Sequence, residues 1–330
     1  MNYIGMDIHK QFTVAVVKDE QGNKLAEEKF NNSEENFGNF MQNYKPEETK
    51  IVIESTGVWE YIYEILEAKK YEVKLANPLK TRAIAGARMK TDSLDASTLS
   101  DLLRGNLIFE SYIPPKEIRR LREITRERRT FVKQTTQIKN RIHAILIKRG
   151  AEFGYATLCE SAILWIKQKF PDDKIILYYL ELLEYHNGKL NEINKIIAEK
   201  SYQDNNAKLL MTIPGIGTIR ALDIVAEIGE ISRFSSANHL SSYSGLVPSI
   251  HQSGNTLRFG KLVKQSSKTL KSDFIEACWN IVRTKESNPL QEFFKKLAKK
   301  KGKQKAICAT ARKLSCVVYV MLRDQKEFRY

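Results

Sequence analysis

The stretch YIGMDIHKQFTVAVVKD, residues 3–19, contains two short runs that are typical of β-strands. A turn-forming sequence, DEQGN, overlaps its end, and the run KLAEEKF that follows predicts a third strand. Ser33 then stands where a helix N-cap is expected, ahead of Phe37, Phe40 and Met41 at helical spacing. The chain therefore opens with three predicted strands and a helix.

Strands and helices alternate in the residues that follow. The run IVIES predicts a buried strand that ends at Glu54, and YEVKLAN predicts another strand. Helices are predicted between these strands, over 59–69, and after them, over 93–105. Three consecutive strands, a helix and then alternating elements follow the order of a ribonuclease H-like (RuvC-like) fold. We therefore predict an α/β domain of this class over residues 1–112.

The middle of the chain, residues 113–206, is predicted to be a basic long helix and a coiled-coil arm. Residues 116–149 carry twelve Lys or Arg against three Glu, with apolar side chains on one helical stripe. Similar spacing returns over 174–200 and suits a helical hairpin or coiled coil, although Gly188 argues against it. Short helices joined by Gly- and Ser-rich loops then predict a second, mainly helical globular domain over 207–330.

The composition indicates a polyanionic partner. The 330 residues contain 54 Lys and Arg against 39 Asp and Glu, a formal net charge of +15, which favours nucleic acid over an acidic membrane surface. We find no signal-peptide pattern and no apolar run of membrane-spanning length, so we expect a cytoplasmic protein. The four cysteines are widely spaced and predict reduced thiols. No GxxxxGK[ST] motif is present, which excludes a P-loop nucleotide site.

Four carboxylates are predicted to meet at one edge of the first sheet. In KTDSLDA, residues 90–96, Asp92 and Asp95 share one helix face, where like charges repel unless a cation lies between them. Asp7 and Glu54 each fall at the end of a predicted strand. Each acid alone could be a solvated surface charge. Their joint placement favours an Mg²⁺ site, in which two ions could act on a phosphodiester.

Two further motifs suggest contacts with phosphate. In LLMTIPGIGTIRALDIVAEIGE, Gly215 and Gly217 lie in a turn between predicted helices, where backbone N–H groups could bind a phosphate as in a helix-hairpin-helix. A tight turn between two helices is the plain alternative. The arginine-rich helix is the other candidate, because guanidinium groups suit a nucleic-acid backbone. The candidate contacts there are Arg119, Arg120, Arg122, Arg126, Arg128, Arg129 and Lys133.

Ser253 is the candidate nucleophile. It precedes Gly254 in a polar segment, with His251 beside it and a group of cations after it that could bind a phosphodiester. Those cations are Arg258, Lys261, Lys264 and Lys268. Ordinary turn chemistry would also place a serine before a glycine, and spacing alone does not exclude the neighbours Ser249, Ser266 and Ser267. The lysine-rich segment FFKKLAKKKGKQK, residues 293–305, is either solvated or in contact with the backbone.

The motifs G-M-D-I-H-K, I-E-S-T-G and K-T-D-S-L-D-A resemble the DEDD signature of an insertion-sequence transposase family. That family comprises bridge-RNA-guided serine recombinases with a RuvC-like domain and is related to pilin-gene invertases. The resemblance implies that Asp7, Glu54, Asp92 and Asp95 bind metal, two Mg²⁺ ions that Mn²⁺ could replace, and that Ser253 is the nucleophile. It also implies donor and target DNA, a non-coding guide RNA, and dimers that assemble into a tetramer.

We therefore predict a DNA transposase or site-specific recombinase that acts through a phosphoserine intermediate. A Holliday-junction-type endonuclease using metal-activated water is the alternative, and a non-catalytic nucleic-acid-binding protein is a third possibility. We also predict that Ser253 of one protomer acts with the acids of another. The dimer contact is predicted to be the apolar repeat Ile176, Leu180, Leu183, Leu190, Ile193 and Ile197. Asp101 is expected to face solvent.

Overall fold

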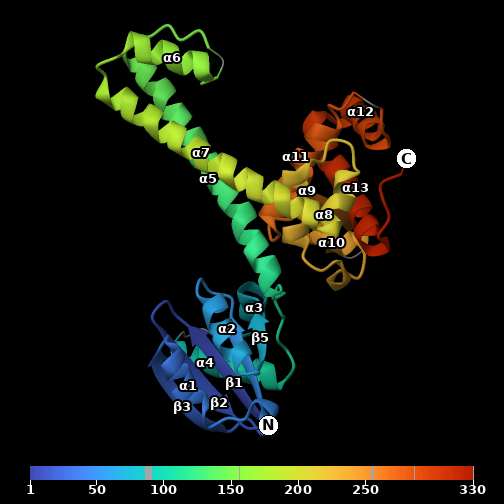
Figure 1. The fold of residues 1–330 in the computed structure, drawn as a ribbon. Helices are drawn as coiled ribbons and strands as arrows, with labels where there is room; N and C mark the ends of the chain where they lie inside the picture. The colour runs from blue at the N-terminus through green and yellow to red at the C-terminus, as the bar shows by residue number, and fades with distance from the viewer. Residues whose placement is uncertain (86–90, 156, 254–255, 286, 330) are drawn as a thin grey trace. The chain divides into compact units, whose positions relative to one another are not determined.

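The computed structural model describes residues 1–85, 91–155, 157–253, 256–285 and 287–329 (Figure 1). The chain forms two compact units, Met1–Ile113 and Pro114–Tyr330. The first unit is mixed α/β and the second is mainly helical. The arm predicted over 113–206 belongs to the second unit. In the part of the chain that the structure describes, no helix is both long and apolar enough to cross a membrane.

The first unit is built on a five-stranded mixed sheet with the order β3-β2-β1-β4-β5. β1 is antiparallel to β2, and β2 is antiparallel to β3, whereas β4 runs parallel to both β1 and β5. All five strands were predicted from the sequence and are confirmed. Their bounds are β1 (Asn2–Ile8), β2 (Phe12–Lys18), β3 (Lys24–Asn31), β4 (Thr49–Glu54) and β5 (Glu72–Ala76).

Side chains alternate along the strands, and both faces of this sheet are buried. Met6 and Ile53 belong to the face that packs on α1 (Glu34–Met41) and α2 (Trp59–Ala68). Val16 and Val52 belong to the opposite face, which packs on α4 (Asp92–Arg104). The sheet therefore lies between helices on both faces. The short helices η1 (Pro46–Glu48) and α3 (Pro78–Ala85) complete the unit, and α3 was not predicted.

Helix α4 is held unusually close to strand β1. The Ser100 hydroxyl donates to the Tyr3 carbonyl at 2.8 Å. A Cβ atom on Gly5 would lie 2.1 Å from the Ala96 carbonyl oxygen, so only glycine allows this approach. Asp101, expected to face solvent, is exposed as predicted, and it also accepts a hydrogen bond from buried Lys18 at 2.6 Å. These contacts fix the position of the helix whose first turn carries Asp92 and Asp95.

We expect Gly5→Ala to lower the free energy of unfolding of the first unit by about 3 kcal/mol, because the added methyl group must push α4 away from β1. Urea unfolding followed by circular dichroism measures this change. Gly38→Ala is the matched control, because its Cβ would meet nothing closer than Lys69 Nζ at 3.8 Å. That substitution lies within α1 and should be neutral or slightly stabilising. Equal changes in unfolding free energy for Gly5→Ala and Gly38→Ala would contradict the close contact between β1 and α4.

The second unit begins with a helical arm (Figure 1). α5 (Lys116–Lys148) pairs with α7 (Lys174–Gln203), and α6 (Glu160–Lys169) lies near the tip. The long helix was predicted and is confirmed, and α7 continues through Gly188. Four of the six residues predicted to form a dimer contact on α7 are instead buried within this chain. Ile176, Leu180 and Leu183 are buried against α5, and Ile197 is buried in the body of the unit, so none of these four is available to another chain.

The body of the second unit packs around α13, whose buried side chains share one core with the neighbouring helices. A hairpin of β6 and β7 departs from the predicted short helices and loops. The sequence contains its signal, because Gly254-Asn255 is a two-residue turn sequence between short runs. The elements are α8 (Asn205–Met211), α9 (Thr218–Ile228), η2 (Ile231–Arg233), α10 (Ala237–Tyr243), β6 (Pro248–Ser253), β7 (Thr256–Leu262), α11 (Lys268–Ile281), α12 (Pro289–Lys301) and α13 (Lys303–Asp324).

Candidate active site

Two of the four predicted acids lie at the ends of neighbouring parallel strands. Met6 of β1 is paired with Ile53 of β4, so the next residues, Asp7 and Glu54, lie beside each other. Side chains alternate along a strand, which places both on the face that packs against α4. Asp7 is buried and Glu54 is partly buried. The register of the sheet therefore brings two carboxylates under the helix.

Asp92 and Asp95 lie in the first turn of α4. Thr91 caps this helix, since its hydroxyl accepts from the Leu94 N–H at 3.2 Å. Carboxylates are favoured at this end of a helix, where unpaired N–H groups give a partial positive charge. Both aspartates are partly exposed. The cap and the contact with β1 thus position the second pair of acids.

Burial raises the pKa of the Asp7 carboxyl above its ordinary value, and the negative charges of Asp92 and Asp95 raise this pKa further. His9 acts in the opposite direction. Its Nε2 atom lies 3.1 Å from Asp7 Oδ2 and 3.3 Å from Asp92 Oδ1. A carboxylate that is buried beside two others is costly without a cation, so the donor set fits a divalent metal ion.

The acids do not all approach one another equally. One ligand atom from each of Asp7, His9 and Asp92 lies within 4.8 Å of the others. Among the described residues, Glu54 and Asp95 are not part of this closest group. Asp95 is near enough to raise the pKa of Asp7, and Glu54 is placed by the strand register. His9 was quoted in a motif but was not predicted as a site residue.

A cavity of about 330 Å³ adjoins this cluster. His9 belongs to both, and the other lining residues come from the end of β1 and from the segments that follow β1 and β4. They are Ile8, Lys10, Thr56, Gly57 and Val58. The Thr56 hydroxyl oxygen is buried and has no hydrogen-bond partner among the described residues. The cavity offers a lysine and a hydroxyl beside the carboxylates, which suits part of a phosphodiester substrate.

Ser253 is the last residue of β6 and is paired with Thr256 of β7. Its side chain lies outside the described part of the structure, as do Gly254 and Asn255. The cations predicted around it are exposed on and after β7: Arg258, Lys261, Lys264 and Lys268. The serine therefore lies where the end of β6 pairs with the start of β7, and β7 leads into exposed positive charge.

Five of the predicted arginine contacts on α5 have partners within the protein. Arg119 is buried and donates to the Pro114 carbonyl at 2.8 Å. Arg122 donates to the backbone carbonyls of Ala226 and Glu227 at the end of α9. Arg126 forms a bidentate salt bridge with the Glu227 carboxylate. Arg128 donates to Asn194, and Arg129 pairs with Asp223 and Asp273. By contrast, Arg120 and Lys133 are exposed.

Asp223 and Asp273 form the buried centre of this charge network. Arg129 and Arg220 both contact the two carboxylates, and Arg220 also pairs with Glu276. Burial raises the pKa of Asp223 to about 6, and the neighbouring carboxylate of Asp273 acts in the same direction, against the two arginines. The network joins α5, α9 and α11 and has a structural role.

The raised pKa of Asp223 makes the stability of the second unit depend on pH. A carboxyl with a folded-state pKa above its unfolded value stabilises the fold fully below the unfolded pKa, and this contribution is lost as pH rises through the folded pKa. Between pH 4 and 7 we expect the unfolding free energy of wild type, relative to Asp223→Asn, to fall by up to about 3 kcal/mol. Urea unfolding at several pH values measures it. Exposed Asp172→Asn is the control, and parallel curves for wild type and Asp223→Asn would contradict the assignment.

The predicted order of helix, turn and helix over residues 209–230 is present as α8, a short connection and α9. Gly215 adopts φ +88°, and a Cβ atom there would lie 2.9 Å from the Ile281 backbone nitrogen. This glycine is therefore explained by packing against the end of α11. Gly217 is exposed at the N-cap of α9, and a Cβ there would meet nothing within 4 Å. Its surroundings leave room for a phosphate at the helix N-terminus.

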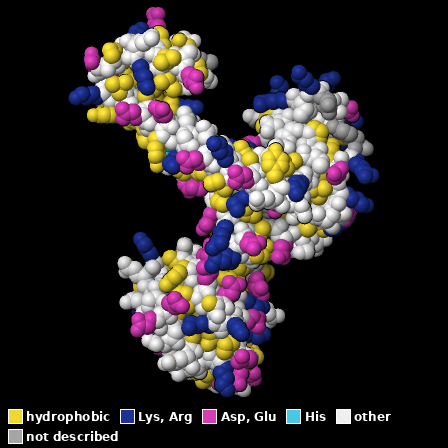
Figure 2. Space-filling view, viewed as in Figure 1, with side chains coloured by type: hydrophobic (Ala, Val, Ile, Leu, Met, Phe, Trp, Pro, Cys, Tyr) yellow, Lys and Arg dark blue, Asp and Glu magenta, His cyan; other side chains and the backbone are white. Residues whose placement is uncertain are grey.

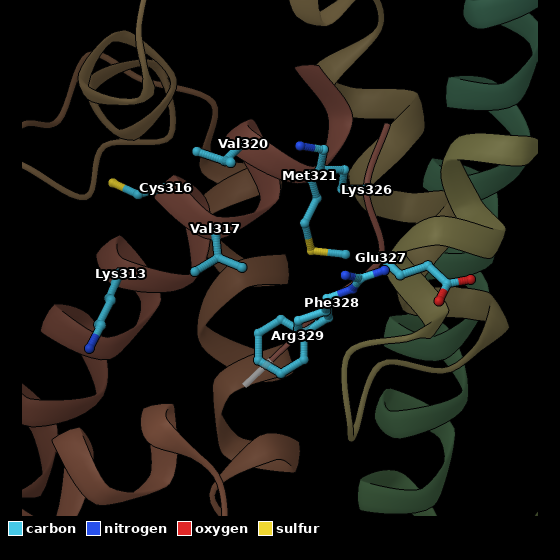
Figure 3. Close-up of a pocket in the computed structure, with 9 residues that line it drawn as sticks. All are labelled: Lys313, Cys316, Val317, Val320, Met321, Lys326, Glu327, Phe328 and Arg329. Carbon is cyan, nitrogen blue, oxygen red and sulfur yellow. The ribbon is translucent and has the colours of Figure 1, made fainter. Parts of the chain in front are cut away.

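Two other surfaces of the second unit stand out. Figure 2 shows Lys and Arg side chains gathered where Figure 1 places α12, whose last turn contains Lys299, Lys300 and Lys301. All seven lysines of residues 293–305 are exposed. A cavity of about 650 Å³ lies between α13 and the segment after it, with Val317, Met321 and Phe328 in its lining (Figure 3). It contains one carboxylate, Glu327, too few for a metal centre of the DEDD kind.

Comparison with known proteins gives a consistent result. A family model described as a transposase, with DEDD and IS110 in its name, matches residues 4–148. A second, described as transposase of the IS116/IS110/IS902 family, matches residues 207–295.

Individual relatives span most of the chain. The pilin gene-inverting protein of Moraxella lacunata is 30% identical over 99% of this chain and 97% of its own length. The transposase for insertion sequence element IS1328 of Yersinia enterocolitica is 23% identical over 96% of both chains. The transposase for insertion sequence element IS1111A of Coxiella burnetii is 24% identical over 84% of this chain and 79% of its own length.

Proposed function

Since the chain belongs to the IS116/IS110/IS902 family of transposases, and is thus a DNA transposase or recombinase, we propose that it cuts and rejoins DNA through a phosphoserine intermediate. The observation that carries the proposal is the cluster of acids at the ends of β1 and β4 and the start of α4. The strand order β3-β2-β1-β4-β5 supports a ribonuclease H-like assignment for this unit.

Asp7, Glu54, Asp92 and Asp95 are proposed to hold two divalent cations, Mg²⁺ in the first instance. Bound there, the ions would polarise the phosphodiester and stabilise the negative charge that develops on it. Asp7 is buried and fixed in a strand, and Asp92 lies in a capped helical turn. The protein's contribution is therefore a rigid set of oxygen ligands, which needs little reorganisation when DNA binds.

In the proposed reaction, Ser253 Oγ attacks phosphorus and forms a serine–phosphate ester as the bond from phosphorus to the leaving deoxyribose oxygen breaks. The serine loses one proton and the leaving oxygen gains one, so the cleaved strand ends in a hydroxyl group. Attack of a hydroxyl from another strand reverses the step and releases the serine. The phosphoester bond is conserved throughout, so rejoining requires no ATP.

We also propose that Ser253 of one protomer acts with the carboxylates of another, within a dimer that pairs into a tetramer. The two groups belong to different compact units of the chain, which supports this arrangement. A non-coding guide RNA is proposed to select donor and target DNA by base pairing. The test is to purify the protein together with transcripts of its element and to sequence the bound RNA. Recovery of one element-derived RNA would support the guide, whereas random transcripts would contradict it.

Exposed cations are proposed to bind the nucleic-acid backbone: Arg120, Lys133, Arg258, Lys261, Lys264, Lys268 and the lysines of α12. Gly217 is proposed as a backbone contact through its place at the N-terminus of α9. Arg119, Arg122, Arg126, Arg128 and Arg129 are better explained by their partners within the protein.

Replacing Lys299, Lys300 and Lys301 by glutamine should weaken nucleic-acid binding and make it less dependent on salt. Three lost phosphate contacts should reduce the slope of log affinity against log salt by nearly three units, about 2.7. Titrations of labelled DNA and RNA at several salt concentrations measure the slope. The control replaces Lys45, Lys69 and Lys70 by glutamine, because these lysines are also exposed but lie in the first unit. The slope for this control should stay near that of wild type. The same change in slope for both triple variants would show that only the net charge of the protein matters, and would contradict a specific contact at α12.

A further inference from the structure

His9 is held rigidly at the edge of the acidic cluster. Its backbone N–H donates to the Phe12 carbonyl at 2.9 Å, and its carbonyl accepts from Asn32 Nδ2 at 2.7 Å. The imidazole ring stacks on the Phe12 ring with centroids 4.6 Å apart. Both the backbone and the plane of the ring are therefore fixed, and Nε2 faces the carboxylates of Asp7 and Asp92.

The separations around His9 match those between ligands of one metal ion. Two ligands at right angles around an ion, each about 2.1 Å from it, lie about 3.0 Å apart. His9 Nε2 lies 3.1 Å from Asp7 Oδ2 and 3.3 Å from Asp92 Oδ1. All three ligand atoms lie within 4.8 Å of one another, and two ligands on opposite sides of an ion would be about 4.2 Å apart. Small side-chain movements would bring all three atoms around one cation.

We propose that His9 Nε2 is a ligand of one of the two metal ions and gives the site a preference for Mn²⁺ over Mg²⁺. This inference rests on the proposed metal centre at the four acids. Imidazole nitrogen binds transition metals well, whereas Mg²⁺ prefers oxygen ligands and keeps its waters. A site with four carboxylates alone would discriminate less between the two ions, because carboxylate oxygens suit both Mg²⁺ and Mn²⁺. The histidine at position 9 would therefore help to determine which metal ion this site prefers.

A purely electrostatic role for His9 makes a different prediction. In that role the ring would pair with Asp7 and Asp92 only until a cation replaced it, and the preference between metals would not depend on the nitrogen. His9→Gln separates the two roles, because the glutamine amide oxygen can reach the position of Nε2 and offers oxygen in place of nitrogen. His9→Asn is a second variant with a shorter reach.

The experiment is calorimetric titration of Mn²⁺ and Mg²⁺ into the full-length protein without DNA. Wild type should bind Mn²⁺ at least about tenfold more tightly than Mg²⁺. His9→Gln should reduce this ratio about tenfold through weaker Mn²⁺ binding, with Mg²⁺ affinity changed less than about threefold. His239→Asn, which alters a histidine in the second unit, should behave like wild type. Unchanged circular dichroism and melting temperature would show that the variants are folded.

A spectroscopic measurement identifies the ligand directly. Pulsed electron paramagnetic resonance of bound Mn²⁺ should show coupling to an imidazole nitrogen in wild type and His239→Asn, and not in His9→Gln or His9→Asn. Unchanged metal preference in His9→Gln, together with no nitrogen coupling in wild type, would overturn the role of His9 and leave the metal centre standing. If wild type binds neither ion, and Asp92→Asn titrates identically, the metal centre itself fails as well.

Discussion

Asp92→Asn should reduce strand cleavage by at least about 10³-fold, a loss of about 4 kcal/mol of transition-state stabilisation. Asparagine is nearly the same size as aspartate but carries no negative charge, so it cannot hold a divalent cation against solvent. Asp92 Oδ1 lies within 3.3 Å of His9 in the closest group of ligands, and its side chain is partly exposed. The fold should therefore be retained while the chemistry is lost. The measurement is the rate at which labelled DNA carrying the element ends is cut with Mg²⁺ or Mn²⁺ present.

Asp101→Asn is the matched control for this prediction. It makes the same substitution on the same helix, but Asp101 pairs with Lys18 and was not predicted to bind metal. Loss of this pair should reduce the stability of the first unit, because Lys18 is buried, while cleavage per folded molecule stays near that of wild type. The two variants should thus separate stability from activity. Similar losses of cleavage in both would mean that α4 acts only through its packing.

Ser253→Ala should reduce strand cleavage and rejoining by at least about 10⁴-fold, because removal of a nucleophile leaves only binding and electrostatic stabilisation. The hydroxyl is proposed to form the bond to phosphorus, and alanine offers no substitute. Ser249→Ala and Ser266→Ala are the controls, since these serines are the near rivals in sequence. Both should stay within about threefold of wild type. If Ser249→Ala or Ser266→Ala lost as much cleavage activity as Ser253→Ala, the assignment of Ser253 as the nucleophile would be contradicted.

Mixing the two inactive proteins tests how the site is assembled. A mixed dimer of Ser253→Ala and Asp92→Asn protomers keeps one intact centre if the serine of one chain acts with the acids of the other. Recovery of cleavage on mixing would support that arrangement. Failure to recover activity, with mixed oligomers demonstrated by mass, would favour a site completed within one chain.

The first unit was predictable because its elements carry strong local signals. Apolar side chains alternate along β1 and form a continuous run in β4, a serine caps α1, and Asp92 and Asp95 follow a threonine cap. The shared edge of Asp7 and Glu54 then followed from the order of the strands. His9 was missed because its importance depends on a contact with Asp92, which is far away in sequence and reaches it only through the packing of α4 on β1.

The second unit was less predictable, because its periodic patterns do not identify their partners. The apolar repeat of α7 predicts a helix pair equally well within a chain and between chains, and the structure pairs it with α5. The arginines of α5 similarly predict an anionic partner. The acids that bind Arg126 and Arg129, Glu227 and Asp273, lie about a hundred residues or more away in sequence, where no local pattern connects them.

The most direct test of the account is the chemical fate of the cleaved phosphate. Wild-type protein would be incubated with labelled DNA in water enriched in ¹⁸O, then denatured, digested and analysed by mass spectrometry. We predict a nucleotide phosphate attached to the peptide that contains Ser253, with no ¹⁸O in the trapped phosphate. Cleaved DNA free of protein, with one ¹⁸O atom in its terminal phosphate, would identify water as the nucleophile. That result would contradict the phosphoserine mechanism and favour a metal-dependent endonuclease.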